Sequence, residues 1–325
     1  MQSIRRNLVA ILMTLLSTLF IGIDASAQTW PQRTVRLIVP LPPGTAVDVT
    51  ARVYAERLAL IWGQSVIVEN LPGADGIIAA REFVNRRDDH SLLYSFAGLV
   101  TINPLAYEKL PYDPSRDLLP IAASSDNFLA IAVSPKLGVA TMADLLKLAR
   151  SRSDKINWAA TAGLPYLTFA GFLKENGVEM VYVPYRDFYP ALGDLKEGRI
   201  GVVSTALNQL LPQEQVGNLK LVAVINRTRS PLALNVPTAA ELGYPDLVFD
   251  GITGFFGWRD MSVELRQRIA ADVRAVAAQP AVVSRFEAIG VVARSGTPAE
   301  FAAAIEEQRV KVAKIAAAIG MRPVP

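Results

Sequence analysis

The sequence predicts an α/β protein built on a parallel sheet, because strand-like and helical segments alternate along its first third. These segments follow one another at Val35–Val39, Val47–Ile61, Val66–Glu69, Ile77–Arg86 and Leu92–Ser95. Parallel strands need crossover connections, usually helices, so this order favours a parallel sheet with helices on its faces. Ligands of such sheets bind outside the carboxyl ends of the strands, which here are the loops at residues 40–45 and 95–98.

The first strand leads directly into a turn and a helix N-terminus. Pro40–Gly44 ends the strand, because proline lacks an amide donor and glycine relaxes the backbone. The helix that follows carries apolar residues on one face, at Val47, Ala51, Tyr54, Leu58 and Ile61, and Gly63 is a stop signal. A strand, a tight loop and a helix N-terminus direct backbone N–H groups at one point. Such a point favours an anion, for example a carboxylate.

Residues 1–27 have the composition of a cleaved export signal. Two arginines precede an apolar core from Leu8 to Ile23, and Ala25–Ala27 forms a small-x-small cleavage site. A membrane anchor is the alternative, but the core is short for a span of about 20 residues and no stop-transfer cluster follows it. We expect cleavage near Ala27 and a mature protein in an exported compartment.

The composition argues against several classes of function. The chain has 325 residues, of which 51% are hydrophobic and 19% charged, as expected of a compact globular protein. A net charge of +3 is too small and too dispersed for a nucleic-acid-binding surface. The absence of cysteine rules out disulfides, thiol catalysis and a lipid-modified N-terminal cysteine. His-Glu-x-x-His and Gly-x-Ser-x-Gly motifs are absent, and His90, the only histidine, is expected at the surface, so an enzyme is not predicted.

Six stretches in order carry a resemblance to a known family. They are WPQRTVRLIVPLPPGTAVDVTAR at 30–52, GQSVIVENLPGADG at 63–76, INPLAYEKLPYDPSRDLLPIA at 102–122, VPYR at 183–186, NVPTAAELG at 235–243 and GTPAEF at 296–301. Together they resemble the Bug-type (TctC-like) periplasmic solute-binding receptors of tripartite tricarboxylate transporters. The resemblance spans nearly all of the chain after the export signal.

The resemblance implies an α/β fold of two Rossmann-like lobes, the clamshell of type II periplasmic binding proteins. Lobe one would comprise residues 28–129 and 250–325, and lobe two residues 130–249. Two crossing strands near Leu129–Ser134 and Phe249–Trp258 would join them, and both segments read as strands. Between them the sequence predicts helices at 142–152, 167–175 and 189–197 and strands at 156–159, 179–183, 200–204 and 219–225. After Ser262 it predicts helices at 263–278, 281–289 and 298–319.

The resemblance also implies a site in which two loops grip one carboxylate of the ligand. The residues placed at this site are Pro43, Gly44, Thr45, Ala46, Asp48, Phe96, Ala162, Gly163, Tyr166, Thr168, Tyr185 and Thr205. Backbone N–H groups of the first loop would donate to the carboxylate, and Thr45 replaces a second family glycine and adds a hydroxyl. For Asp48 we place a first-turn role opposite the helix dipole above direct ligand contact.

The second loop departs from the family pattern of glycine-asparagine-glycine-serine-serine followed, after one residue, by histidine. Here it reads Ala162–Thr168, so hydroxyls remain at Tyr166 and Thr168 while a proline removes one amide donor. Thr205 stands where the family has an aspartate, and Phe96 stands at a small polar position. Ordinary drift and a pocket retuned toward a larger, more apolar ligand explain these changes equally well. Our hypothesis is a carboxylate with an apolar or aromatic body, rather than citrate or an acidic amino acid.

These expectations describe a periplasmic receptor that captures a small carboxylate and delivers it to the membrane permease subunits of a tripartite tricarboxylate-type transporter. We expect it to act as a monomer, without cofactor, metal or nucleic acid. The alternative is a ligand-sensing binding protein that signals to a membrane sensor kinase, and the sequence alone does not separate the two. An exported hydrolase is a third class, for which no pair of acids is marked out by spacing.

Overall fold

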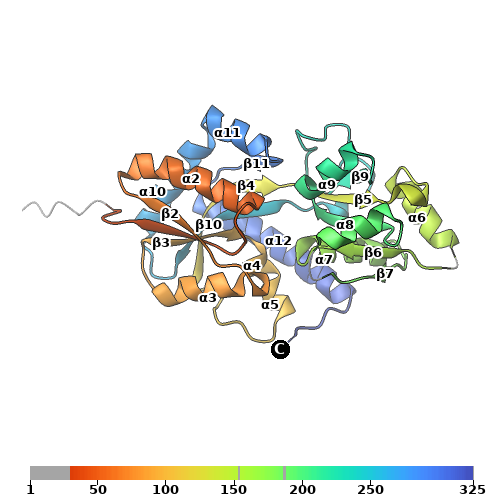
Figure 1. The fold of residues 1–325 in the computed structure, drawn as a ribbon. Coiled ribbons are helices and arrows are strands. Elements are labelled where there is room, and N and C mark those ends of the chain that lie inside the picture. The colour runs from red at the N-terminus through yellow and green to blue at the C-terminus, as the bar shows by residue number, and fades with distance from the viewer. Residues whose placement is uncertain (1–29, 153, 186–187, 325) are drawn as a thin grey trace, which may run out of the picture.

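The protein contains two β-sheets, each covered on both faces by helices and joined by two crossing segments of chain (Figure 1). The computed structural model describes residues 30–152, 154–185 and 188–324. This architecture is the two-lobed α/β clamshell predicted above. The predicted export signal, residues 1–27, lies outside the described residues. None of the helices in the described ranges combines the length and hydrophobicity that a membrane span requires.

The sheet of lobe one has six strands in the order β11-β4-β10-β3-β1-β2. In chain order they are β1 Val35–Val39, β2 Val66–Asn70, β3 Ser91–Phe96, β4 Leu118–Asn127, β10 Gly251–Trp258 and β11 Val291–Ala293. The first three are parallel to one another, as predicted. β10, β4 and β11 each run antiparallel to their neighbours, so the complete sheet is mixed.

Helices bury both faces of this sheet. One face carries α2 Ala46–Trp62, α10 Val263–Ala277 and α11 Pro280–Glu287, and the other carries α3 Ile77–Arg86, the short α4 Gly98–Thr101 and α5 Asn103–Ala106, and α12 Pro298–Ala318. Tyr54 of α2 is fully buried at the centre of the first layer, where its ring packs edge-on to Phe255 with centroids 5.2 Å apart. Its hydroxyl donates to the Ser124 carbonyl over 3.0 Å, so this buried polar group is satisfied.

The sheet of lobe two has five strands in the order β7-β6-β8-β5-β9. They are β5 Leu129–Val133, β6 Asn157–Ala160, β7 Val181–Tyr182, β8 Val202–Ala206 and β9 Lys220–Val224. Its helices are α6 Met142–Ser151 and α7 Leu164–Glu175 on one face and α8 Tyr189–Lys196 and α9 Leu207–Gln215 on the other. Single 3₁₀ turns occur at Ala74–Gly76, Pro135–Leu137 and Pro245–Leu247.

The chain crosses between the sheets where β4 ends at Asn127 and β5 begins at Leu129, and again before β10. Asn226, in the loop after β9, braces the first crossing, because its amide donates to the Asn127 carbonyl over 3.0 Å and its Oδ1 accepts from the Leu129 N–H over 2.8 Å. α12 also joins the lobes. Its C-terminal half packs so closely on α7 that a Cβ at Gly171 would lie 2.8 Å from Ile315 Cγ2.

Two differences from the predicted elements have local causes. β4 was not predicted because its sequence contains Pro120 and polar residues, and the structure places this proline beside a register shift of the sheet, where its missing N–H is tolerated. α7 begins at Leu164, not near Leu167. Gly163, with φ of 83°, precedes it, and Pro165 occupies the first turn, where a helix needs no amide donor.

Candidate functional site

Four strand-to-helix turns occupy the edges at which the two lobes meet. β1 and β3 are parallel and lead into α2 and α4, whereas β6 and β8 are parallel and lead into α7 and α9. In each lobe the carboxyl ends of these strands therefore share one edge of the sheet. The lobes approach one another there, because a Cβ at Gly163 would lie 3.9 Å from Ile102 Cδ1 of lobe one. We call the four turns, around residues 43–46, 96–98, 161–163 and 205–207, the interlobe turns.

The first interlobe turn leads into the N-terminus of α2, whose first backbone N–H groups are available to a ligand. Thr45 is the N-cap of α2, and its hydroxyl donates to the Pro42 carbonyl over 2.9 Å while accepting from the Asp48 N–H over 3.4 Å. The Thr45 proton is therefore used inside the turn, so the expectation that this hydroxyl would be added to the ligand site is wrong. Among the described residues, the N–H groups of Ala46 and Val47 have no hydrogen-bond partner. These two donors carry the partial positive charge of a 17-residue helix, which is the arrangement that binds anions.

Asp48 holds this turn in place. Its carboxylate is buried and accepts from the Gly44 N–H over 2.9 Å, the Asn70 amide over 2.8 Å and Arg52 Nε over 3.0 Å. Burial raises the pKa of this carboxyl, but the hydrogen bonds from Arg52, Gly44 and Asn70 lower it more, so the net pKa lies below its usual value. Asp48 is thus ionised in the first turn of α2, and its hydrogen bonds position the turn.

The turn before α7 contributes fewer hydroxyls than predicted. Thr168 is buried, and its hydroxyl donates to the Leu164 carbonyl over 2.8 Å, so the prediction that Thr168 supplies a free donor is wrong. A threonine inside a helix commonly makes this bond to the preceding turn. The ring of Tyr166 stacks on Trp158 with centroids 5.6 Å apart and an interplanar angle of 12°. Ala162 is exposed and Gly163 half-buried at the tip of the turn.

A hydrogen-bonded chain follows the ends of β6 and β8. Thr205 is fully buried and donates its hydroxyl proton to Gln209 Oε1 over 2.7 Å. Its oxygen lies 3.2 Å from Thr161 Oγ1, so Thr161 is the donor in that contact. Oε1 of Gln209 accepts this hydrogen bond, and its Nε2 has no hydrogen-bond partner in the described part of the protein; the residue is half-buried. Thr161 and Gln209 were not predicted as site residues, because folding brings them beside Thr205.

Phe96 and Tyr185 lie in different surroundings. Phe96 ends β3 and folds its ring over the next turn, so that a Cβ at Gly98 would meet Phe96 Cδ2 at 2.9 Å. Tyr185 donates its hydroxyl to Asp194 Oδ2 over 2.5 Å, and burial together with this carboxylate raises its pKa to about 12. The Tyr185 hydroxyl is therefore used in a hydrogen bond to Asp194 of α8. Arg186 and Asp187, which follow Tyr185, lie outside the described residues.

The sole histidine is buried, contrary to the expectation that it lies at the surface. His90 is 7% exposed and packs beside Trp30. Its Nε2 accepts from the Gln32 N–H over 3.2 Å, so Nδ1 is the donor to Asp89 Oδ1 at 2.7 Å. Asp88, Asp89 and His90 form the one cluster of potential metal ligands in the described part of the chain. Because both ring nitrogens of the histidine are engaged, we assign no metal there.

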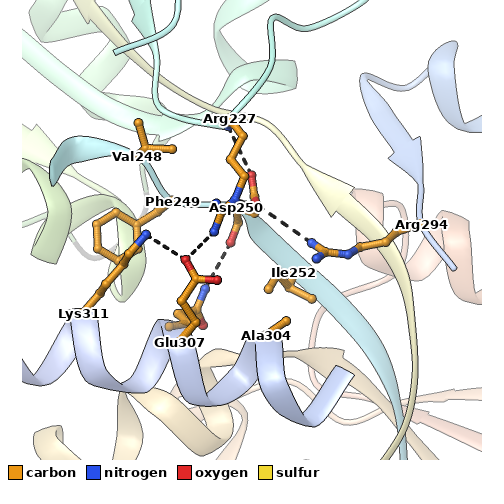
Figure 2. A pocket seen from close by; sticks show the side chains of 10 residues that line it. Arg227, Val248, Phe249, Asp250, Ile252, Arg294, Ala304, Glu307 and Lys311 are labelled. Carbon is orange, nitrogen blue, oxygen red and sulfur yellow. Dashed lines mark hydrogen bonds and ion pairs between the residues drawn. The ribbon is translucent and has the colours of Figure 1, made fainter. Parts of the chain in front are cut away.

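Two hollows lie away from the interlobe turns. One, of about 20 Å³, is lined by Arg227, Asp250 and Glu307 near the crossing strands, and it has room for about one water (Figure 2). The other is a groove of about 470 Å³ between α10 and the start of α12, lined in part by Arg266 and Arg274. No motif in the sequence indicated either hollow.

Comparisons with known proteins identify the family. A family model described as "Tripartite tricarboxylate transporter family receptor", TctC, matches residues 50–321. A UPF0065 protein of Bordetella bronchiseptica is 31% identical over 92% of this chain and 89% of its own, and protein BugT of Bordetella pertussis is 28% identical over 90% and 91%. The solved structure of R. palustris Rpa4515 with adipate is similar with a TM-score of 0.80 and 28% identity, over 91% of this chain and 100% of that one. The chain therefore belongs to the TctC family of solute-binding receptors.

Proposed function

We propose that this receptor captures a carboxylate between its lobes and delivers it to the permease subunits of a tripartite tricarboxylate-type transporter. The observation that carries the proposal is the pair of unpartnered N–H groups, on Ala46 and Val47, at the N-terminus of α2. The Asp48 carboxylate is already neutralised by Arg52, so it does not oppose an incoming anion. The similar R. palustris protein was solved with adipate, a dicarboxylate.

The opposite lobe suggests which carboxylates are accepted. Thr161, Thr205 and Gln209 are uncharged, and Gln209 presents an amide N–H₂. A second anionic or carbonyl group of the ligand can therefore approach without repulsion. Ile102 and the Phe96 ring supply apolar surface beside the interlobe turns. We infer a ligand with two polar ends and an apolar body, such as adipate, in preference to citrate or an acidic amino acid.

The cellular setting completes the proposal. Residues 1–27 act as an export signal cleaved near Ala27, and the mature protein works in the periplasm as a monomer. Residues 28–129 with 250–325 form one lobe and 130–249 the other, and they close around the ligand by bending at the crossing strands. The family, described as that of a transporter receptor, supports transport over the sensing alternative and a binding role over an enzymatic one.

A binding experiment with matched ligands tests the carboxylate. Calorimetric titration of the mature protein should detect adipate and should detect no binding of adipamide, which has the same body without charge. Aromatic monocarboxylates, citrate and glutamate extend the panel. Binding of adipamide equal to that of adipate, or tight binding of citrate or glutamate alone, would contradict the proposed ligand class.

Proline substitutions at the N-termini of two helices test the backbone N–H donors of α2. Ala46→Pro removes one N–H at the first position of α2, where proline fits the helix and the preceding Thr45 is already extended, with ψ of 158°. Loss of one charge-assisted hydrogen bond should weaken adipate binding about tenfold or more. Val263→Pro is the matched control, because Val263 holds the same position in α10 after an extended Ser262, away from the interlobe turns. Equal affinity in both variants would remove Ala46 from the site.

A further inference from the structure

A cluster of charged side chains spans the two lobes beside the crossing strands (Figure 2). Arg227, in the loop after β9, pairs with Asp250 Oδ2 at 2.9 Å and with Glu307 of α12. Glu307 also accepts from Lys311 Nζ at 3.0 Å. Arg227 follows a strand of lobe two, whereas the helix that carries Glu307 packs on β4 of lobe one. The Arg227–Glu307 pair therefore connects the lobes directly.

A second group extends the cluster along the same side. Arg294 follows β11 and binds the Asp126 carboxylate at 2.9 Å, and the same guanidinium lies 3.9 Å from Asp250. Asp250 is thus shared between the cations of the two lobes. Asp126 and Asp250 stand at the ends of the crossing strands β4 and β10. The charges are consequently centred on the segments that must bend when the lobes move.

The order of strands places the two arginines of this cluster, Arg227 and Arg294, on the side of the crossing strands opposite the interlobe turns. In lobe one β3, β1 and β2 lie on one side of the pair β10-β4, and β11 lies on the other. In lobe two β8, β6 and β7 lie on one side of β5, and β9 lies on the other. The interlobe turns belong to β1, β3, β6 and β8, whereas Arg227 and Arg294 follow β9 and β11. In Figure 1, β11 of lobe one and β9 of lobe two both lie in the upper part of the view.

Gly290 of lobe one also packs on lobe two, in part on the loop after β9 that carries Arg227. A Cβ at Gly290, which precedes β11, would lie 3.3 Å from Leu232 Cδ1 and 3.7 Å from Asn208 Cβ of lobe two. Leu232 and Arg227 both lie in the loop after β9, so we expect a rotation about the crossing strands that brings the interlobe turns together to draw the Gly290–Leu232 contact and the Arg227–Glu307 pair apart. Contacts on this side therefore resist closure, while contacts with a ligand favour it.

We propose that the Arg227–Glu307 pair is a latch that holds the lobes open and so sets ligand affinity without touching the ligand. Both side chains are about half exposed, at 55% and 48%, so the latch is weak enough to be released by ligand binding. Its removal shifts the ligand-free protein toward the closed form and tightens binding, because less of the binding energy is spent on closing. The inference rests on the proposed function only in taking the lobes to move.

A distance measurement in the ligand-free protein tests the latch. The chain contains no cysteine, so Ile67→Cys and Val181→Cys can each carry a spin label on exposed positions of β2 and β7. These are the edge strands farthest from the crossing strands on the side of the interlobe turns. Closure must therefore shorten the distance between the labels. Glu307→Gln should move the distance distribution of the mature, doubly labelled protein to shorter values, and Arg227→Gln should do the same.

Glu306→Gln is the matched control. Glu306 lies one residue earlier on α12 and pairs with Arg309 of the same helix, so its removal eliminates one charge without affecting a contact between lobes. Its distance distribution should equal that of the parent. Unchanged or longer distances in both Glu307→Gln and Arg227→Gln would overturn the latch.

Affinity for adipate provides a second readout. Glu307→Gln should lower the Kd by up to about fivefold, the range expected of a half-exposed ion pair, and Glu306→Gln should leave it unchanged. A higher Kd in Glu307→Gln would overturn the latch. If the parent does not bind adipate, adipate is not its ligand, and the label distances still decide the latch.

Discussion

Thr205 donates its hydroxyl proton to Oε1 of Gln209 over 2.7 Å, and this bond orients the Gln209 amide at the edge of lobe two. The family resemblance places an aspartate at position 205, which would add a negative charge there. The neutral pair is therefore the clearest local reason to expect a ligand with a second anionic group. The replacement of the family aspartate by Thr205 can be read from the sequence, but its partner Gln209 was not predicted.

Thr205→Asp should weaken adipate binding by more than about tenfold, because two like charges at close range in a partly buried site repel by more than 1.4 kcal/mol, roughly. Thr205→Asn is the matched control, with a side chain of similar shape and no charge. It should stay within about threefold of the parent. Calorimetric titration with adipate measures both. Equal affinities of the two variants would show that no anionic group of the ligand lies near this position.

Asp48→Asn should lower the free energy of unfolding by about 1–3 kcal/mol at neutral pH, because the amide cannot accept all the donors that converge on the carboxylate. The folded-state pKa of Asp48 lies below the ordinary value of 3.8, so its stabilisation is fully present above that pH. It is lost as the pH falls through the lowered folded-state pKa. Urea unfolding across this range should show the gap between parent and variant shrinking toward acid. A gap that is constant or grows toward acid would contradict this role.

Gly171→Ala should destabilise the protein by about 1–3 kcal/mol, because the new methyl group would lie 2.8 Å from Ile315 where α7 meets α12. Gly193→Ala is the control at an exposed helical glycine, where the added methyl group would have nothing within 4 Å. It should raise stability by about 0.5–1 kcal/mol, since alanine favours the helix. Thermal and urea unfolding report both changes. Equal effects of the two would mean that α7 and α12 do not pack as closely as described.

Tyr185→Phe should leave adipate affinity unchanged and cost about 1 kcal/mol of stability or less. Its hydroxyl has a pKa of about 12, stays protonated at neutral pH and is engaged with Asp194, which also pairs with Arg199. Titration and unfolding of the same preparation separate the two effects. A clear loss of affinity would place the hydroxyl at the ligand instead of in the scaffold of lobe two.

The first interlobe turn was predictable only in part: its position and the first-turn carboxylate of Asp48 were expected, whereas the Thr45 hydroxyl and the Gly44 N–H bond within the turn. Gly44, Thr45 and Asp48 act within a few residues of one another, and an N-cap with a first-turn carboxylate depends on backbone geometry that neighbouring residues impose. The second turn was less predictable. Thr168 was expected to donate outward, but its nearest acceptor is a carbonyl of its own helix. His90 was expected at the surface, and this expectation was wrong. Trp30, which is distant in the sequence, packs beside its ring.

The sequence by itself determined the alternation of strands and helices, the α2 N-terminus and, through its motifs, the family. These features follow from short-range backbone preferences and apolar periodicity. Only the tertiary structure decided which polar groups remain free for a ligand and which are used internally. Arg227 and Glu307 are 80 residues apart in the chain, and nothing local to either indicates the other. Their pairing exists because the crossing strands and α12 bring distant side chains within reach, and long-range packing of this kind leaves no local signal.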